Sequence, residues 1–103
     1  MAAAWKEWER RVAKWLGGRR SGARGEGVAD VIEQREDWIS AECKHRKELP
    51  KWLDEWIAQA KTNAEPGQCP VIFVHVHRQP YLDGFVILPV REFLDRFVGS
   101  VEE

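Results

Sequence analysis

Apolar side chains recur at helical spacing in three stretches of the chain, and each stretch predicts an amphipathic helix. The first covers residues 3–17 and ends at Gly17-Gly18, with glycine in its usual C-terminal position. A basic, glycine-rich loop is predicted to follow it over residues 18–27. The second opens at Pro50, and the third opens at Pro89 and ends at Gly99. The apolar positions of the three helices are Trp5, Trp8, Val12, Trp15 and Leu16, then Trp52, Leu53, Trp56, Ile57 and Ala60, then Val90, Phe93, Leu94, Phe97 and Val98.

Four shorter runs between these helices are rich in β-branched and aromatic residues and predict strands. They cover residues 28–33, 38–44, 70–77 and 85–88. The first two runs are separated by a short polar turn at residues 34–37, so we expect them to pair as a hairpin. The predicted order is α-β-β-α-β-β-α, which favours a mixed β-sheet flanked by helices, in the α/β or the α+β class. With 103 residues, the chain fits a single domain over residues 1–103.

The composition is that of a globular protein in a reducing compartment. Hydrophobic residues make up 44% of the chain and charged residues 32%, and two cysteines are too few for a disulfide framework. No stretch approaches the roughly 18 uninterrupted apolar residues of a membrane span. We therefore expect no membrane partner and a cytoplasmic location, which is the host cytoplasm if a phage encodes the chain.

Positive charge is concentrated near the beginning of the chain. Residues 1–24 carry seven Lys or Arg and two Glu, a formal charge of +5, and the chain's total of −1 leaves −6 for the rest. No acid lies between Arg10 and Arg24, and a cluster this dense favours a polyanionic partner such as nucleic acid. A solvated helix face followed by a loop is the alternative. The candidate DNA-binding residues are Arg10, Arg11, Lys14, Arg19, Arg20, Ser21 and Arg24.

The second predicted strand projects charge from one face. Side chains alternate along a strand, so Glu42 and Lys44 point to one side while Cys43 points to the apolar side. Asp30, on the strand expected to pair with it, lies opposite the end that carries Glu42. Two carboxylates and one lysine therefore converge. A surface Glu42–Lys44 pair without function is the alternative, but it does not explain an aspartate inside an apolar run.

This trio has the residues that metal-assisted phosphodiester cleavage requires. Mg²⁺ binds one or two protein carboxylates together with substrate phosphate oxygens, and Mn²⁺ accepts the same ligands. The metal lowers the pKa of bound water, while a nearby lysine orients that water, deprotonates it or stabilises developing charge. The sequence therefore predicts a site for Mg²⁺, with Mn²⁺ able to substitute.

The first helix places its two glutamates differently. At about 100° per residue, Glu9 lies roughly 70° from the centre of the apolar stripe, whereas Glu7 falls on the far side. We expect Glu9 to reach inward beside the sheet and Glu7 to be solvated.

The pattern Asp30…Glu42-Cys43-Lys44 resembles the signature of the PD-(D/E)XK nuclease superfamily, D…E-x-K on a hairpin behind an N-terminal helix. Within that superfamily the chain looks most like the archaeal-type Holliday junction resolvases, including small phage-borne versions. The resemblance also includes Glu9-Arg10 and Arg20-Ser21-Gly22 and extends over nearly the whole chain, although Ala29 stands where the signature has a proline.

The resemblance implies a restriction-endonuclease-like fold and a homodimer that resolves four-way DNA junctions in recombination and repair. It also implies that Glu9 joins Asp30 and Glu42 at the metal, and that the backbone carbonyl of Cys43 completes the metal shell. Gln59, on the second helix, matches a supporting glutamine of related nucleases; an ordinary solvated position is the alternative. The arginines would hold the DNA backbone without reading sequence.

Two alternatives remain at this stage. One is a PD-(D/E)XK nuclease of another specificity, such as a nickase, a flap nuclease or a restriction-type enzyme. The other is a non-catalytic basic module that binds DNA, in which Glu42 and Lys44 form a surface pair.

His75 and His77 share one strand face near Cys69, but their spacing matches no usual zinc pattern.

Overall fold

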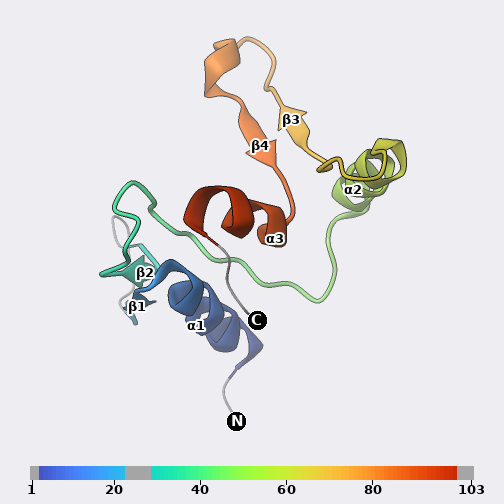
Figure 1. The fold of residues 1–103 in the computed structure, drawn as a ribbon. Coiled ribbons are helices and arrows are strands. Elements are labelled where there is room, and N and C mark those ends of the chain that lie inside the picture. Colours follow the sequence, from blue (N-terminus) through green and yellow to red (C-terminus); the bar gives the residue numbers. More distant parts are fainter. Residues whose placement is uncertain (1–2, 23–28, 100–103) are drawn as a thin grey trace. The chain divides into compact units, whose positions relative to one another are not determined.

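The computed structural model describes residues 3–22 and 29–99. These residues form a mixed α/β protein with three helices and two small antiparallel sheets (Figure 1). The described residues divide into two compact units, residues 3–22 with 29–47 and residues 48–99. The predicted α/β character is confirmed in this general sense. One mixed sheet of restriction-endonuclease type, and a single domain over residues 1–103, stay predictions.

Helix α1 (Ala4–Leu16) opens the first unit, as the hydrophobic pattern predicted. It ends at Gly17, whose backbone has a left-handed φ of 74°. The amide of Gly17 donates to the carbonyl of Lys14 and that of Gly18 to the carbonyl of Ala13. These two bonds form a Schellman motif, which satisfies carbonyls that the helix end leaves without partners.

The buried face of α1 consists of Glu9, Ala13 and Leu16, at i, i+4 and i+7. Trp5 belongs to the predicted apolar stripe, but it is 42% exposed. The stripe therefore predicted the helix correctly and placed the centre of its buried face too far from Glu9.

Strand β1 (Arg19–Arg20) pairs antiparallel with β2 (Val31–Ile32), whose Val31 is the most deeply buried side chain described. Gly18 makes the approach of the two segments possible. A Cβ added to Gly18 would lie 2.5 Å from the carbonyl oxygen of Ile32. The sequence had assigned Arg19 and Arg20 to a loop, and this assignment is wrong.

The strand predicted over residues 38–44 is absent from the described chain, and the strand predicted over 28–33 is confined to β2, with residue 28 outside the described part. The two segments are nevertheless neighbours, because the amide of Asp30 donates to the carbonyl of Ala41 at 2.9 Å. The amide of Cys43 donates instead to the side chain of Asp30 at 2.6 Å. In a regular β-ladder the Cys43 amide would donate to a backbone carbonyl; here it donates to the Asp30 carboxylate.

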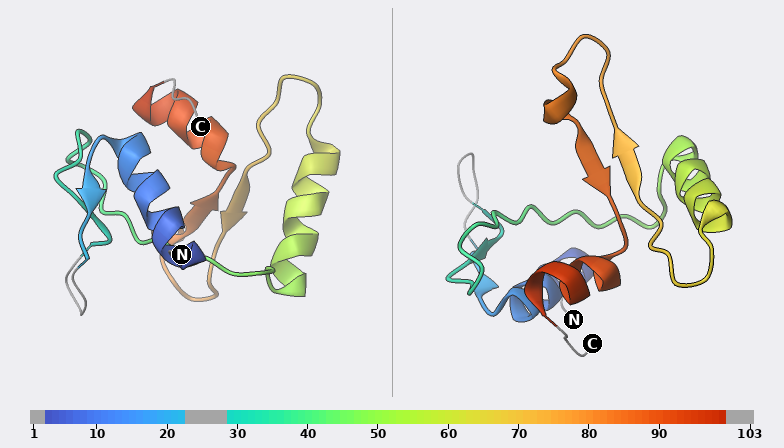
Figure 2. Two further views of the ribbon diagram at one scale, coloured as in Figure 1. Left: turned by 90° about the horizontal axis from the view of Figure 1, so that it is seen from below. Right: turned by 45° about the horizontal axis from the view of Figure 1, so that its top comes forward.

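The second unit contains α2 (Lys51–Asn63) and an antiparallel pair, β3 (Ile72–Val74) and β4 (Phe85–Ile87). Figure 2 shows the two strands lying side by side and joined by a long connection that includes the 3₁₀ turn at Tyr81–Asp83. Helix α2 contacts β3, and a small apolar pocket between helix and sheet is lined by residues such as Ile57 and Ile72. The strands are shorter than predicted.

The last predicted helix divides into α3 (Val90–Phe93) and a π-helical turn, Leu94–Val98, and it ends at Gly99 as expected. Leu94 is its buried residue. Within the described ranges 3–22 and 29–99, no helix has the length and apolar character needed to cross a membrane.

Candidate functional site

Asp30 is the structural junction of the first unit. Its carbonyl accepts from the amide of Ser21 at 3.0 Å, and its own amide donates to Ala41. Its Oδ2 accepts from the amide of Cys43 at 2.6 Å. These bonds tie the end of β1, the start of β2 and residues 41–43 together around one half-buried carboxylate. The backbone therefore fixes the Asp30 side chain next to the E-x-K segment.

Glu42 and Lys44 project together, as their spacing predicted. Lys44 Nζ lies 2.9 Å from Glu42 Oε1, and the two side chains are 80% and 62% exposed. Glu42 raises the pKa of Lys44 by its hydrogen bond and its charge, and the charge of Asp30 raises it further. The ammonium thus lies in the field of both carboxylates.

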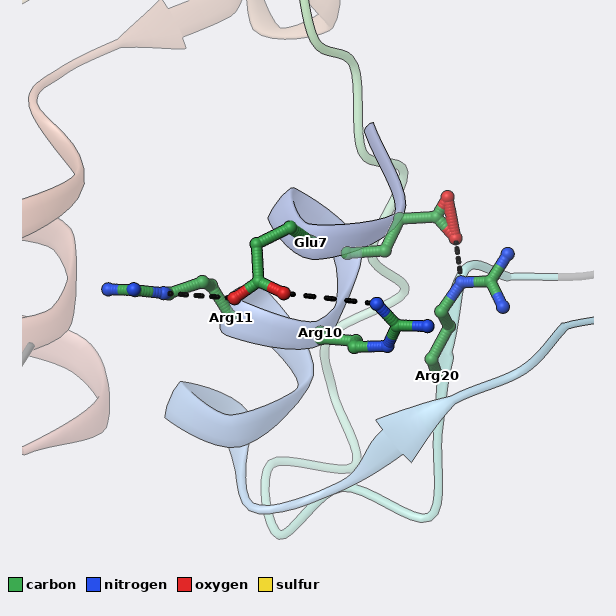
Figure 3. Close-up of polar contacts among 5 residues, drawn as sticks. Glu7, Arg10, Arg11 and Arg20 are labelled. Atoms are coloured by element: carbon green, nitrogen blue, oxygen red, sulfur yellow. Dashed lines mark hydrogen bonds and ion pairs between the residues drawn. The ribbon is translucent and has the colours of Figure 1, made fainter. Parts of the chain in front are cut away.

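Glu9 and Glu7 differ as the helix geometry predicted, and Figure 3 shows Glu7 with its two partners, Arg10 and Arg11. The Glu9 side chain is only 11% exposed, and its Oε1 accepts a hydrogen bond from Nε of Arg20 at 2.9 Å. Glu7 is 56% exposed and lies 3.8 Å from Arg10 and 3.6 Å from Arg11 in surface ion pairs. The inward placement of Glu9 is confirmed; its role as a metal ligand stays a prediction.

The pKa of the Cys43 thiol depends on three acidic side chains. Burial, followed by the negative charges of Asp30, Glu9 and Glu42, raises the pKa of its thiol to about 11. A negative charge disfavours a thiolate only where it lies nearby. The Cys43 thiol therefore lies in the field of three carboxylates from three segments, and Asp30 contacts Cys43 directly through the Cys43 amide.

The donor set suits a hard divalent cation. Among residues 3–22 and 29–99, no three His, Cys, Asp or Glu side chains lie close enough together to hold a metal ion. Mg²⁺ requires fewer, because it keeps several waters and uses one or two protein carboxylates. Asp30 and Glu42 are two such carboxylates, whereas the buried Glu9 is paired with Arg20.

Each of the four arginines of the basic cluster within the described chain has an acidic partner. Arg10 and Arg11 pair with Glu7, and Arg20 pairs with Glu9. Arg19 forms two hydrogen bonds to Glu33, at 2.8 and 3.1 Å, and both side chains are largely exposed. Pairing of this kind lowers the pKa of Glu33 through the hydrogen bond and charge of Arg19.

The remaining members of the predicted DNA-binding set have different positions. Lys14 is exposed on the last turn of α1, and Ser21 donates its backbone amide to Asp30. Arg24 lies outside the described residues. Sequence reasoning missed Trp5, whose ring centroid is 5.4 Å from the Arg20 guanidinium. Trp5 and Glu9 are four residues apart and so lie on the same face of α1. This spacing could have predicted that both contact one side chain, that of Arg20.

Gln59, His75 and His77 belong to the second unit. Gln59 is exposed on α2. His75 Nε2 lies 2.8 Å from the carbonyl oxygen of Gln79, and its ring is stacked on Tyr81 with centroids 4.7 Å apart. His77 is exposed. The supporting role predicted for Gln59 stays a prediction.

No protein family model, curated protein or solved structure significantly matches the chain.

Cys43 gives a test of this arrangement that does not depend on activity. In EDTA, alkylation of Cys43 in a Cys69→Ser variant should reach half its maximal rate at about pH 11 rather than at the 9.0 of an ordinary thiol. Asp30→Asn, Glu9→Gln and Glu42→Gln should each move the midpoint down, because each removes a neighbouring negative charge. Asp37→Asn, an exposed control, should leave it unchanged. An ordinary midpoint in the parent protein would contradict the burial of the thiol, and unchanged midpoints in all three variants would contradict the placement of the carboxylates near Cys43.

Proposed function

We propose that the protein is a Mg²⁺-dependent, structure-selective DNA endonuclease of the PD-(D/E)XK type that resolves four-way junctions by paired symmetric nicks. The observation that carries the proposal is that the Asp30 carboxylate accepts from the amide of Cys43, which fixes it next to the segment that bears the Glu42–Lys44 pair. These are the residue types that cutting a phosphodiester with a hard cation requires.

Each residue has a defined task in this proposal. Asp30 and Glu42 would hold Mg²⁺ with the backbone carbonyl of Cys43, Glu9 would join them on leaving Arg20, and Mn²⁺ would substitute. When bound, the cation activates water and offsets charge on the scissile phosphate. Glu42 and Asp30 raise the pKa of Lys44, which is therefore a cation at neutral pH. As a cation, Lys44 orients the attacking water and stabilises developing negative charge.

The arginines bind the DNA backbone. Arg10, Arg11 and Arg19 are exposed and paired only with surface acids, which contribute little energy and exchange readily for phosphate. Such contacts position a duplex without reading its sequence, as a structure-selective enzyme requires.

A non-catalytic DNA-binding module is the second candidate, and the exposure of the Glu42–Lys44 pair favours it. Such a pair is also what a surface without chemistry displays. The two candidates differ in their dependence on metal, because a module retains DNA affinity in EDTA and never cuts.

A panel of DNA substrates tests the proposal. The protein is incubated with four-way junction, flap, nicked and linear duplex DNA, each with Mg²⁺ and with EDTA. We expect cutting in Mg²⁺ alone, with the four-way junction cut fastest. Preferred cutting of flap or linear DNA would assign a PD-(D/E)XK nuclease of another specificity, and no cutting of any substrate would favour the binding module.

Paired nicks require two sites, so we expect a homodimer. A four-way junction has two-fold symmetry, which a cyclic dimer matches. The second unit exposes apolar rings suited to such an interface: Trp52 is 55% exposed, Trp56 41% and Phe97 54%. Trp52 and Trp56 form an edge-to-face pair with centroids 5.0 Å apart.

Light scattering at micromolar concentration should give a mass about twice the 12.0 kDa of one chain. Trp52→Ser, by removing an exposed ring, should shift the protein toward the monomer, whereas Gln59→Ser on the same helix should not. A parent protein with a mass near 12 kDa and uncoupled single nicks would contradict the dimer.

A further inference from the structure

Arg20 is the one arginine of the described basic cluster whose acidic partner is buried. Its Nε donates to Glu9 Oε1 at 2.9 Å, with side-chain exposures of 25% and 11%. The Arg20 guanidinium also lies over the ring of Trp5, with 5.4 Å to the centroid. The neighbouring Arg19–Glu33 pair has exposures of 60% and 64%. Arg20 thus contacts both a buried carboxylate and an aromatic ring.

Glu9 requires a cation beside it. A carboxylate removed from water is stable only when it is paired and hydrogen-bonded, and loss of one partner of a buried pair is strongly destabilising. In the structure the Arg20 guanidinium meets that requirement. If Glu9 also binds metal, guanidinium and metal compete for the same carboxylate.

We propose that Arg20 is a positioning residue that exchanges partners: it neutralises Glu9 in the metal-free protein and is released to a DNA phosphate when a divalent cation takes Glu9. The inference rests on the proposed metal site. Metal binding then strengthens DNA binding, because the guanidinium that Glu9 had bound becomes available for a bidentate contact with a phosphate.

The surroundings of Arg20 suit this exchange. Strand β1 pairs Arg20 with Val31, and the next residue, Ser21, donates its amide to Asp30. The Arg20 backbone is therefore fixed one residue from the proposed ligand, while its side chain remains able to turn. Trp5 contacts the guanidinium through the face of its ring. This contact is preserved when the guanidinium turns while staying over the ring.

DNA affinity in Ca²⁺ and in EDTA tests the exchange. The probe is a fluorescent four-way junction, with Ca²⁺ replacing Mg²⁺ and gels confirming that the DNA stays intact. We expect Arg20→Gln to reduce affinity about tenfold more in Ca²⁺ than in EDTA, a difference of about 1.4 kcal/mol. Arg19→Gln, the matched control on the same strand, should reduce affinity by the same factor in both conditions, because its partner Glu33 is exposed and outside the carboxylate group.

Two further variants keep the test decisive if Arg20→Gln fails to fold. Glu9→Gln releases Arg20 without metal, so it should bind DNA more tightly than the parent protein in EDTA. Glu9→Gln combined with Arg20→Gln leaves no unpaired buried charge, and it should lose that gain. Equal effects of Arg20→Gln in Ca²⁺ and EDTA, or a Glu9→Gln gain that persists without Arg20, would overturn the exchange.

Cleavage in Mg²⁺ is scored separately on the same proteins. A parent protein that cuts, but whose Arg20 dependence is the same with and without metal, contradicts the exchange and leaves the nuclease proposal standing. A parent protein that shows the Arg20-dependent gain in Ca²⁺ and never cuts supports the exchange and contradicts the nuclease proposal.

Discussion

In EDTA, Asp30→Asn should bind a four-way junction with at least the affinity of the parent protein, and in Mg²⁺ it should cut the junction at least about a hundredfold more slowly. The substitution removes a ligand charge, yet an Asn side-chain oxygen can still accept the hydrogen bond that the Cys43 amide donates to Asp30 Oδ2. The local structure is therefore retained while the metal is lost. Glu42→Gln should behave in the same way, and single-turnover cleavage beside a binding titration measures both effects.

Lys44→Ala completes this test, because it should be nearly as inactive while retaining metal binding. Asp37→Asn is the matched control, since Asp37 is exposed and outside the carboxylate group. We expect it to cut at the parent rate. Near-parental cutting by Asp30→Asn, Glu42→Gln or Lys44→Ala would show that the site is assigned to the wrong residues.

The second large effect separates two glutamates of one helix. Glu9→Gln should lose at least about tenfold more cleavage activity than Glu7→Gln, because Glu9 is buried beside the site and Glu7 forms only surface pairs. Glutamine keeps the size of the side chain and removes the charge that pairs with Arg20. Cleavage rates in Mg²⁺, with thermal unfolding as a check on folding, measure the difference.

Equal and mild losses from the two variants would assign Glu9 a structural role only. In that case Asp30 and Glu42 would be the complete set of protein carboxylates at the metal. A large loss from Glu7→Gln alone would contradict the helix geometry on which the distinction rests.

The helical periodicity was sufficient to predict α1 and α2, and it also predicted the inward placement of Glu9. Both helices follow from local rules, because a repeating apolar face and a glycine or proline at the ends define where a helix begins and stops. The position of Glu9 follows from the same rotation per residue. The proximity of Glu42 and Lys44 follows equally from the alternation of side chains.

The strands of the first unit required information that a local pattern does not contain. Arg19 and Arg20 have no strand-like side chains, and they pair with β2 through the backbone where Gly18 allows a close approach. Residues 38–44 look like a strand, but Asp30 captures the Cys43 amide with its side chain. The pairing of Arg20 with Glu9 could not be predicted either. It joins a helix to a strand that the sequence had assigned to a loop.

The central claim is that this chain makes paired, metal-dependent nicks across a DNA branch. A supercoiled plasmid that extrudes a cruciform tests it directly, because two coupled nicks across one junction yield a linear molecule, whereas one nick yields a relaxed circle. We expect the parent protein to convert the plasmid to linear product in Mg²⁺ and to leave it supercoiled in EDTA. A plasmid that remains supercoiled in Mg²⁺, under conditions where the protein binds the junction, would contradict the account.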